Sequence, residues 1–190
     1  MMRATLNDRD LVVDILTRSF IDNKSVNYII KQDEKKEQRI KGLMKYSFDI
    51  CNLFGDVFIS DDKNGCALIV LPDRKKTTIK SILLDIKMAL FVIGLSNIKK
   101  VISRESVISK IHPGKDIYYL WFIGVQPSEQ GRGVGSQLLN EIIQKAISER
   151  KTICLETSTI KNIPWYEKHG FAIYREIDFG YKLCCMKMSY

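Results

Sequence analysis

The sequence predicts an α/β fold in which a mixed, mostly antiparallel, twisted sheet is flanked by helices. Three segments lead to this class: a candidate hairpin within 56–71, a strand–loop–helix–strand unit within 118–157, and a closing pair of strands within 171–188. A hairpin joins antiparallel neighbours, whereas a crossover helix joins parallel ones. The length of 190 residues fits a single domain, 1–190. The 45% hydrophobic and 27% charged residues are typical of a globular chain.

Two amphipathic helices are expected before the hairpin. The segment Asp8–Phe20 has apolar residues at the spacing of one helix face, and Asn7 or Asp8 is placed to cap it. A second helix is predicted to end near Gly55. Its face is formed by Ile40, Leu43, Met44, Ser47, Phe48 and Cys51.

Short β-branched runs at Asp56–Ser60 and Gly65–Leu71 flank a polar segment that ends in Asn64-Gly65. An Asn-Gly pair between such runs is a strong hairpin signal, so two antiparallel strands are expected.

The segment Pro72–Gly114 interrupts this pattern with one or two helices. Helical spacing relates Ile79, Ile82, Leu83, Ile86, Leu90 and Ile93. We expect this apolar stripe to dock on the sheet, with Lys80, Lys87 and the cluster Arg74–Lys76 facing outward. A further helix is predicted over Asn97–Ser109.

The second half alternates buried strands and helices before it closes on an antiparallel pair. The expected strands are Tyr118–Val125, Thr152–Thr157, Phe171–Ile177 and Tyr181–Met188, and the expected helices are Gln137–Ser148 and Asn162–His169.

Composition narrows the class of protein. Five cysteines and two histidines occur without zinc spacing, so we expect reduced, buried thiols and no metal. The amino end lacks a signal-peptide pattern, and charges interrupt the longest apolar segment; the prediction is therefore a cytoplasmic protein with no membrane partner. A net charge of +8 favours an anionic ligand.

The segment after Val125 carries the clearest chemical signal. Gly131, Gly133 and Gly135 alternate between a buried strand and a helix start, where free backbone N–H groups and the helix dipole favour a phosphate. Ser136-Gln137 does not match a P-loop, and Ser136 stands where a dinucleotide fingerprint needs Gly or Ala. A glycine-rich turn without a ligand is the plainer alternative.

Two motifs frame the helix and strand that follow this loop. The first is Val125-x-Pro127-x-x-Gln130-Gly131-Arg132-Gly133-Val134-Gly135. The second is Leu155-Glu156-Thr157 followed by Asn162–Phe171. Together they resemble the GNAT superfamily of N-acetyltransferases, which transfer acetyl groups from acetyl-CoA. Tyr119-Leu120 and the Leu-Glu-Thr-Ser sequence at 155–158 look most like its puromycin and trichothecene acetyltransferase-like branch, although Ile117-Tyr118-Tyr119-Leu120 lacks a histidine common there.

The resemblance implies a GNAT-type sheet with the helical insert between strands 3 and 4, and acetyl-CoA as co-substrate. The backbone of Ile123 and Val125 would bind the pantetheine, Gln130–Gly135 the pyrophosphate, and Asn162 the pantetheine again. The implied binding residues are Ile123, Gly124, Val125, Gln130, Gly131, Arg132, Gly133, Val134, Gly135, Ser136, Asn162 and Tyr166.

Catalysis would then fall to Tyr166, which lies beside the thioester sulfur in many members, and to Glu156. A phenol can protonate a departing thiolate, and a carboxylate can accept, through water, the proton that an ammonium must lose before the amine attacks. The alternatives are an aromatic ring packed under the sheet and a structural carboxylate. His112 is expected at the surface and His169 at a helix cap.

The sequence leaves the acceptor open among a small amine, an antibiotic amino group and a protein amine. The insert is expected to line the acceptor side of the cleft, with Met88 and Phe91 at its rim. Between residues 73 and 104 there are eight basic residues and two acidic ones, so a nucleic-acid-binding protein is one alternative. A non-catalytic acyl-CoA-binding protein is another. A monomer or a homodimer is expected.

Overall fold

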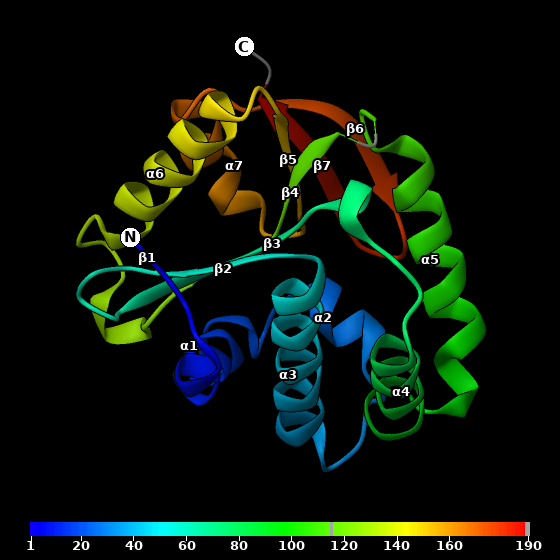
Figure 1. Ribbon diagram of the computed structural model, residues 1–190. Coiled ribbons are helices and arrows are strands. Elements are labelled where there is room, and N and C mark those ends of the chain that lie inside the picture. The colour runs from blue at the N-terminus through cyan, green and yellow to red at the C-terminus, as the bar shows by residue number, and fades with distance from the viewer. Residues whose placement is uncertain (115, 189–190) are drawn as a thin grey trace.

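The computed structural model describes residues 1–114 and 116–188 and places a seven-stranded sheet at the centre of the chain (Figure 1). The strand order is β1-β2-β3-β4-β5-β7-β6. The strands are β1 (Met2–Arg3), β2 (Gly55–Ile59), β3 (Gly65–Val70), β4 (Ile117–Val125), β5 (Thr152–Thr157), β6 (Ala172–Asp178) and β7 (Lys182–Met188). Among these described strands, only β4 and β5 pair in parallel, which confirms the predicted mixed, mostly antiparallel sheet.

Helices cover both faces of the sheet. The helices are α1 (Arg9–Phe20), α2 (Lys24–Ile29), α3 (Lys36–Phe54), α4 (Ile79–Met88), α5 (Ile98–Ile111), α6 (Val134–Ser148) and α7 (Ile163–Lys168). α1 and α3 pack on one face, and α6 and α7 on the other (Figure 1). β1 and the short helix α2 have no counterpart in the sequence prediction, because two strand residues and six helical residues are too few to show a period.

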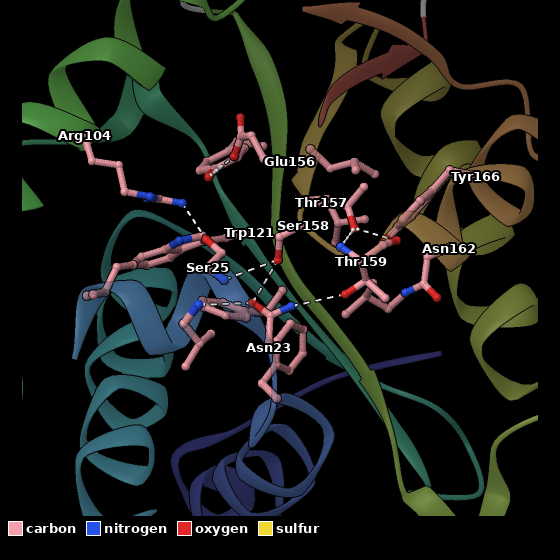
Figure 2. Close-up of a pocket in the computed structure, with 18 residues that line it drawn as sticks. Asn23, Ser25, Arg104, Trp121, Glu156, Thr157, Ser158, Thr159, Asn162 and Tyr166 are labelled. Carbon is pink, nitrogen blue, oxygen red and sulfur yellow. Dashed lines mark hydrogen bonds between the residues drawn. The ribbon is translucent and has the colours of Figure 1, made fainter. Parts of the chain in front are cut away.

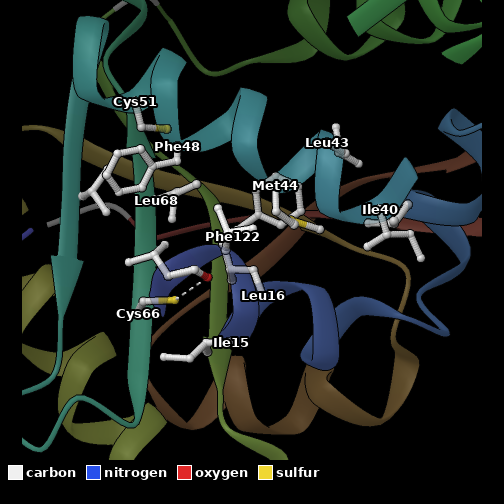
Figure 3. Packing of buried hydrophobic residues seen from close by; sticks show 14 of the residues in the cluster. Ile15, Leu16, Ile40, Leu43, Met44, Phe48, Cys51, Cys66, Leu68 and Phe122 are labelled. Carbon is white, nitrogen blue, oxygen red and sulfur yellow. Dashed lines mark hydrogen bonds between the residues drawn. The ribbon is translucent and has the colours of Figure 1, made fainter. Parts of the chain in front are cut away.

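The larger core lies between α1, α3 and strands β2–β4 (Figure 3). Phe48 and Met44 of α3 pack over Leu68 of β3 and Phe122 of β4. All five cysteines are free and buried, as expected. Burial raises the pKa of the Cys185 thiol to about 12, so this thiol stays neutral.

The hairpin between β2 and β3 is confirmed, but its turn differs from the expected one. Lys63 carries the left-handed conformation, with φ 59°, and the strand resumes at Gly65. The carboxylate of Asp62 accepts the N–H of Asn64 at 3.0 Å and stabilises this turn. The Asn-Gly pair thus marks the hairpin without forming the turn itself.

The insert between β3 and β4 contains the predicted helices, but the apolar stripe does not dock on the sheet. α4 instead packs beside α3 through Ser81 and Met88, and the Tyr46 hydroxyl donates to Asp85 Oδ1 at 2.7 Å (Figure 1). Because α1 and α3 already cover that face of the sheet, the stripe has no sheet surface left to meet. Its residues Ile79, Ile82, Leu83, Ile86 and Leu90 are exposed, whereas Ile93 is buried.

A helix break separates the two parts of the insert. After a widened turn, η3 (Ala89–Ile93), Gly94 takes φ 76° and the chain turns by 103° into η4 (Leu95–Asn97) and α5. None of the described helices is by itself long and apolar enough to cross a membrane; the two parts of the insert meet that criterion only as this bent pair.

Gly55, where α3 meets β2, provides a test of the packing. A Cβ at this position would lie 2.0 Å from the carbonyl oxygen of Ile69, which is backbone and has no room to move. We expect Gly55→Ala to lower the free energy of unfolding by about 1–3 kcal/mol or more, as overpacking does. Urea unfolding followed by circular dichroism measures this loss. Gly135→Ala is the control and should cost less, because its Cβ would meet only side-chain atoms at ordinary contact distances, Val125 Cγ2 at 3.4 Å and Trp165 Cζ2 at 3.7 Å.

Candidate active site

The site is built around the place where β4 and β5 separate. The two strands pair only over Ile117–Tyr119 and Thr152–Cys154. Beyond that point β4 continues beside β3, as far as Val125 opposite Gly65, while β5 continues beside β7. The gap between them leaves backbone groups of β4 without a strand partner.

The backbone direction of β4 follows from one hydrogen bond. The N–H of Gln126 donates to the Asn64 carbonyl at 2.8 Å, on the β3 side. Because backbone groups alternate along a strand, Ile123 and Val125 direct theirs into the gap. The Val125 carbonyl there accepts from Ser19 Oγ at 2.9 Å and from Gln130 Nε2 at 3.2 Å.

A cavity of about 530 Å³ fills the gap and extends along the loop that follows β4. Ten of the predicted binding residues line it: Ile123, Gly124, Val125, Gln130, Gly131, Gly133, Gly135, Ser136, Asn162 and Tyr166. Arg132 and Val134 do not. The Arg132 side chain is exposed, with Nη1 3.0 Å from Glu129 Oε2, and Val134 lies against Gly65.

The loop Gln130–Gly135, which we call the glycine loop, adopts the geometry that its sequence suggests. Gly131 has φ 80° and Gly133, the N-cap of α6, has φ 89°, conformations that side chains rarely adopt. A Cβ at either position would meet nothing within 4 Å, so both backbones border open space. The N-terminal N–H groups of α6 thus lie beside the cavity, where they can bind an anion.

A second, smaller cavity of about 90 Å³ adjoins the first at the point of strand separation (Figure 2). Both cavities are lined by Phe20, Asn23, Ile123, Thr159, Asn162 and Tyr166. Tyr166 is 6% exposed, and burial raises the pKa of its phenol above the ordinary range. The hydroxyl therefore stays protonated at neutral pH.

Glu156 lines the smaller cavity from β5. One carboxylate oxygen accepts the Tyr119 hydroxyl at 2.5 Å, and the other lies 3.2 Å from His112 Nε2. Burial and the adjacent Glu156 raise the pKa of Tyr119 well above its usual value, so Tyr119 remains the donor.

The expectation for His112 is wrong. Its side chain is only 13% exposed and packs on the Tyr119 ring, with ring centroids 4.8 Å apart. This placement arises because α5 ends at Ile111, close to the start of β4. His169 is the C-cap of α7, as expected, with Nδ1 2.7 Å from the Trp165 carbonyl oxygen.

Arg104 is a site residue that the sequence analysis does not identify. It reaches the smaller cavity from α5, where its Nη2 donates to Ser25 Oγ at 2.6 Å (Figure 2). Its Nε donates to the Tyr181 hydroxyl at 3.0 Å. The insert thus lines the smaller cavity through α5, whereas Met88 and Phe91, expected at the rim of the cleft, line neither cavity. One signal was available: Arg104 continues the spacing of buried Val101 and Ile108.

Polar groups from distant segments also meet at this cavity. Ser158 Oγ donates to Asn23 Oδ1 at 3.3 Å and accepts from the N–H of Ser25, and Asn23 Nδ2 donates to Thr159 Oγ1 (Figure 2). Asn23 also caps α2 by accepting the Val26 N–H. Local sequence offers no hint of these contacts, because they join residues more than 130 positions apart.

Comparison with known proteins decides the family. A model of the acetyltransferase (GNAT) domain matches residues 65–173, more than half of the chain. The chain belongs to the GNAT acetyltransferase family. Members of this family use acetyl-CoA as co-substrate. The GNAT sheet with its helical insert between strands 3 and 4 is confirmed.

Solved structures share the fold over nearly the whole chain. A structure described as histone acetyltransferase HPA2 and related acetyltransferase, from Corynebacterium glutamicum, is 22% identical with a TM-score of 0.71, and the match covers 99% of this chain and 94% of that one. The C-terminal condensation domain of Ebony, solved with β-alanyl-dopamine, is 11% identical with a TM-score of 0.73, covering 100% and 97%. An N-acetyltransferase from Staphylococcus aureus is 15% identical with a TM-score of 0.57, covering 98% of each chain.

A further match, by sequence, is to a protein that is described as a kinase, and it covers 42% of this chain. Over 80 residues it is 34% identical to a probable serine/threonine-protein kinase of Dictyostelium discoideum. The chain spans 8% of that protein.

Within this GNAT chain, Gly133 tests whether the glycine loop binds acetyl-CoA. Gly133→Val would put a β-branched side chain at φ 89° and fill the open space beside the cavity. We expect acetyl-CoA affinity, measured by calorimetry, to fall at least tenfold, about 1.4 kcal/mol.

Gly180→Val is the matched control. Gly180 has φ 81° with equally open surroundings, but it lies in the β6–β7 turn. This control should lose stability to a similar degree and keep its affinity. Equal affinity in both variants would remove the loop from the binding site.

Proposed function

We propose that the chain is an N-acetyltransferase that transfers the acetyl group of acetyl-CoA directly to a primary amine. The observation that carries this proposal is the pair of adjoining cavities at the separation of β4 and β5, with Tyr166 lining both. The larger cavity would hold the pantetheine and pyrophosphate, and the smaller one the amine. The resemblance at Tyr119-Leu120 and 155–158 further supports membership of the puromycin and trichothecene acetyltransferase-like branch.

Binding of the co-substrate would use the backbone of β4 and of the glycine loop. Ile123 and Val125 face the gap and would pair with the amide groups of the pantetheine like an added strand. The N–H groups from Gln130 to Ser136 would bind the pyrophosphate, with Asn162 on the opposite wall. The Trp165 indole donates to Ser136 Oγ at 2.9 Å, which fixes α7 against α6 across this loop.

The reaction forms a bond between the amine nitrogen and the acetyl carbon and breaks the carbon–sulfur bond. The Val125 N–H would donate to the developing oxyanion. Tyr166 would give its hydroxyl proton to the departing thiolate. The amine nitrogen releases a proton to solvent as the amide forms, and Tyr166 regains one from solvent. Because burial keeps the Tyr166 phenol protonated, this hydroxyl is available as the acid at neutral pH.

Glu156 would accept the proton that the acceptor's ammonium group must lose before the neutral amine can attack. An alkylamine with a pKa of about 10.4 is only about one part in a few thousand neutral at pH 7. The Glu156 carboxylate lines the small cavity and would receive the proton through water. The volume of this cavity, about 90 Å³, favours an amine that enters end-on, either a small molecule or the tip of a longer chain.

A panel of amines tests the proposed function. Free CoA should be released from acetyl-CoA only when a suitable primary amine is present, and mass spectrometry should find that amine carrying one acetyl group. Binding of acetyl-CoA with no release for any amine would favour the non-catalytic acyl-CoA-binding alternative. Binding of nucleic acid without affinity for acetyl-CoA would favour the other.

Tyr166→Phe removes one hydroxyl and tests its role as the acid. We expect kcat to fall by about 10² or more, within the range of general acid catalysis, with acetyl-CoA affinity retained. Steady-state kinetics and calorimetry measure the two effects. Tyr174→Phe, which removes a buried hydroxyl on β6 outside both cavities, is the control. An unchanged kcat in Tyr166→Phe would assign that ring to packing alone.

Glu156→Gln keeps the shape of the side chain but not its charge. If Glu156 accepts the proton, kcat/KM for the amine at pH 7 should fall by about 10² or more and recover as pH rises toward the pKa of the amine. Glu156→Asp should retain part of the rate. Glu176→Gln, which removes an exposed ion pair with Lys182, is the control. A rate loss that is equal at every pH would leave Glu156 a structural carboxylate.

A further inference from the structure

The outer side of α4 carries an apolar surface that the fold leaves uncovered. It consists of Ile79, Ile82, Leu83, Ile86 and Leu90, which we call the outer apolar face. Ile79 is 81% exposed, and Phe91 and Leu95 continue the exposed apolar surface into the turn that follows, at 69% and 71%. Such a cluster of large exposed apolar side chains marks an interaction site.

The orientation of α4 is fixed by its inner side. Met88 and Ser81 are buried there, Asp85 accepts the Tyr46 hydroxyl, and Thr78 caps the helix by accepting the Ser81 N–H at 3.1 Å. The outer apolar face is therefore held away from the body and does not result from a loosely packed helix.

Cations border this face. Lys80 and Lys87 lie seven residues apart, hence on the same side of the helix, next to the apolar residues. Arg74, Lys75 and Lys76 are exposed just before α4 begins. Asp85, the acidic residue of the helix, is also exposed, but it lies on the side of the helix opposite Lys80 and Lys87 and accepts the Tyr46 hydroxyl of α3.

We propose that α4 binds the surface of an anionic lipid bilayer. An amphipathic helix of this kind lies in the plane of the interface, with its apolar residues immersed and its lysines at the level of the lipid phosphates. The sequence-based expectation of no membrane partner rested on the charges that interrupt this apolar segment. Such charges argue against a membrane span but not against binding at a membrane surface, and the stripe is exposed. In the cytoplasm, anionic leaflets attract such basic segments.

Charge distinguishes the bilayer from other occupants. A second copy would meet the face through a two-fold axis and bring the lysines of both copies together, which is unfavourable. Nucleic acid would attract the cations but leave the apolar residues in water. An anionic bilayer would bury the apolar residues and attract the lysines. This proposal does not depend on the acetyltransferase chemistry.

Co-sedimentation with vesicles tests the proposal on the full chain. We expect binding to phosphatidylcholine vesicles that contain phosphatidylserine, weaker binding in high salt, and little binding to phosphatidylcholine alone. The triple variant Ile82→Ser, Leu83→Ser, Ile86→Ser should weaken binding at least tenfold. Leu6→Ser, at an exposed apolar residue elsewhere, should not. In Phe91→Trp, vesicles should shift the tryptophan emission to shorter wavelength.

The double variant Lys80→Gln, Lys87→Gln tests the role of charge. It should weaken binding to the vesicles and reduce the salt dependence of that binding. The matched control is Lys63→Gln with Lys168→Gln, two exposed lysines outside the insert. The proposal would be overturned if the protein did not bind the vesicles that contain phosphatidylserine. It would also be overturned if the triple variant bound them as well as the unchanged protein does. A lipid-free dimer that the triple variant dissociates would assign the face to a second copy instead. Because α4 lines neither cavity, CoA release by the triple variant should be unchanged.

Discussion

The short parallel contact between β4 and β5 determines the rest of the architecture. Each strand has a better partner on its outer side, β3 for one and β7 for the other, so the two separate after three paired residues. Hydrogen-bonding groups of β4 are then left facing a gap in the middle of a sheet. Backbone groups in that position need partners, and a ligand with amide groups of its own can supply them. Helix α6, which begins beneath the gap, adds unpaired N–H groups at the same place.

Sequence reasoning worked where period, turn chemistry and motif order acted together. The hairpin, the crossover unit and the closing strands were all predictable because each has a local signal, and the glycine loop could be placed because its neighbours set its context. Ten of the twelve predicted binding residues line one cavity. Arg132 is the instructive exception, since a residue between two glycines can contribute backbone while its side chain points to solvent.

The insert shows where local signals fail. Periodicity identifies an apolar face of α4 but does not say what that face meets, and the sheet it was expected to cover was already occupied by α1 and α3. The real contact uses Ser81, Asp85 and Met88 against α3, a less apolar line. Arg104 and His112 were missed for a related reason. Their roles depend on Ser25, Tyr181 and Glu156, which lie in other parts of the chain.

The register of β3 and β4 gives the insert a further property. Val70 pairs directly with Tyr119, so the chain leaves the sheet and returns to it at adjacent positions. Such a closed excursion can change length or sequence at modest cost to the strands that flank it. The excursion nevertheless supplies Arg104 to the small cavity. A change of length or sequence in this insert would therefore alter the wall of the small cavity while the glycine loop stayed in place.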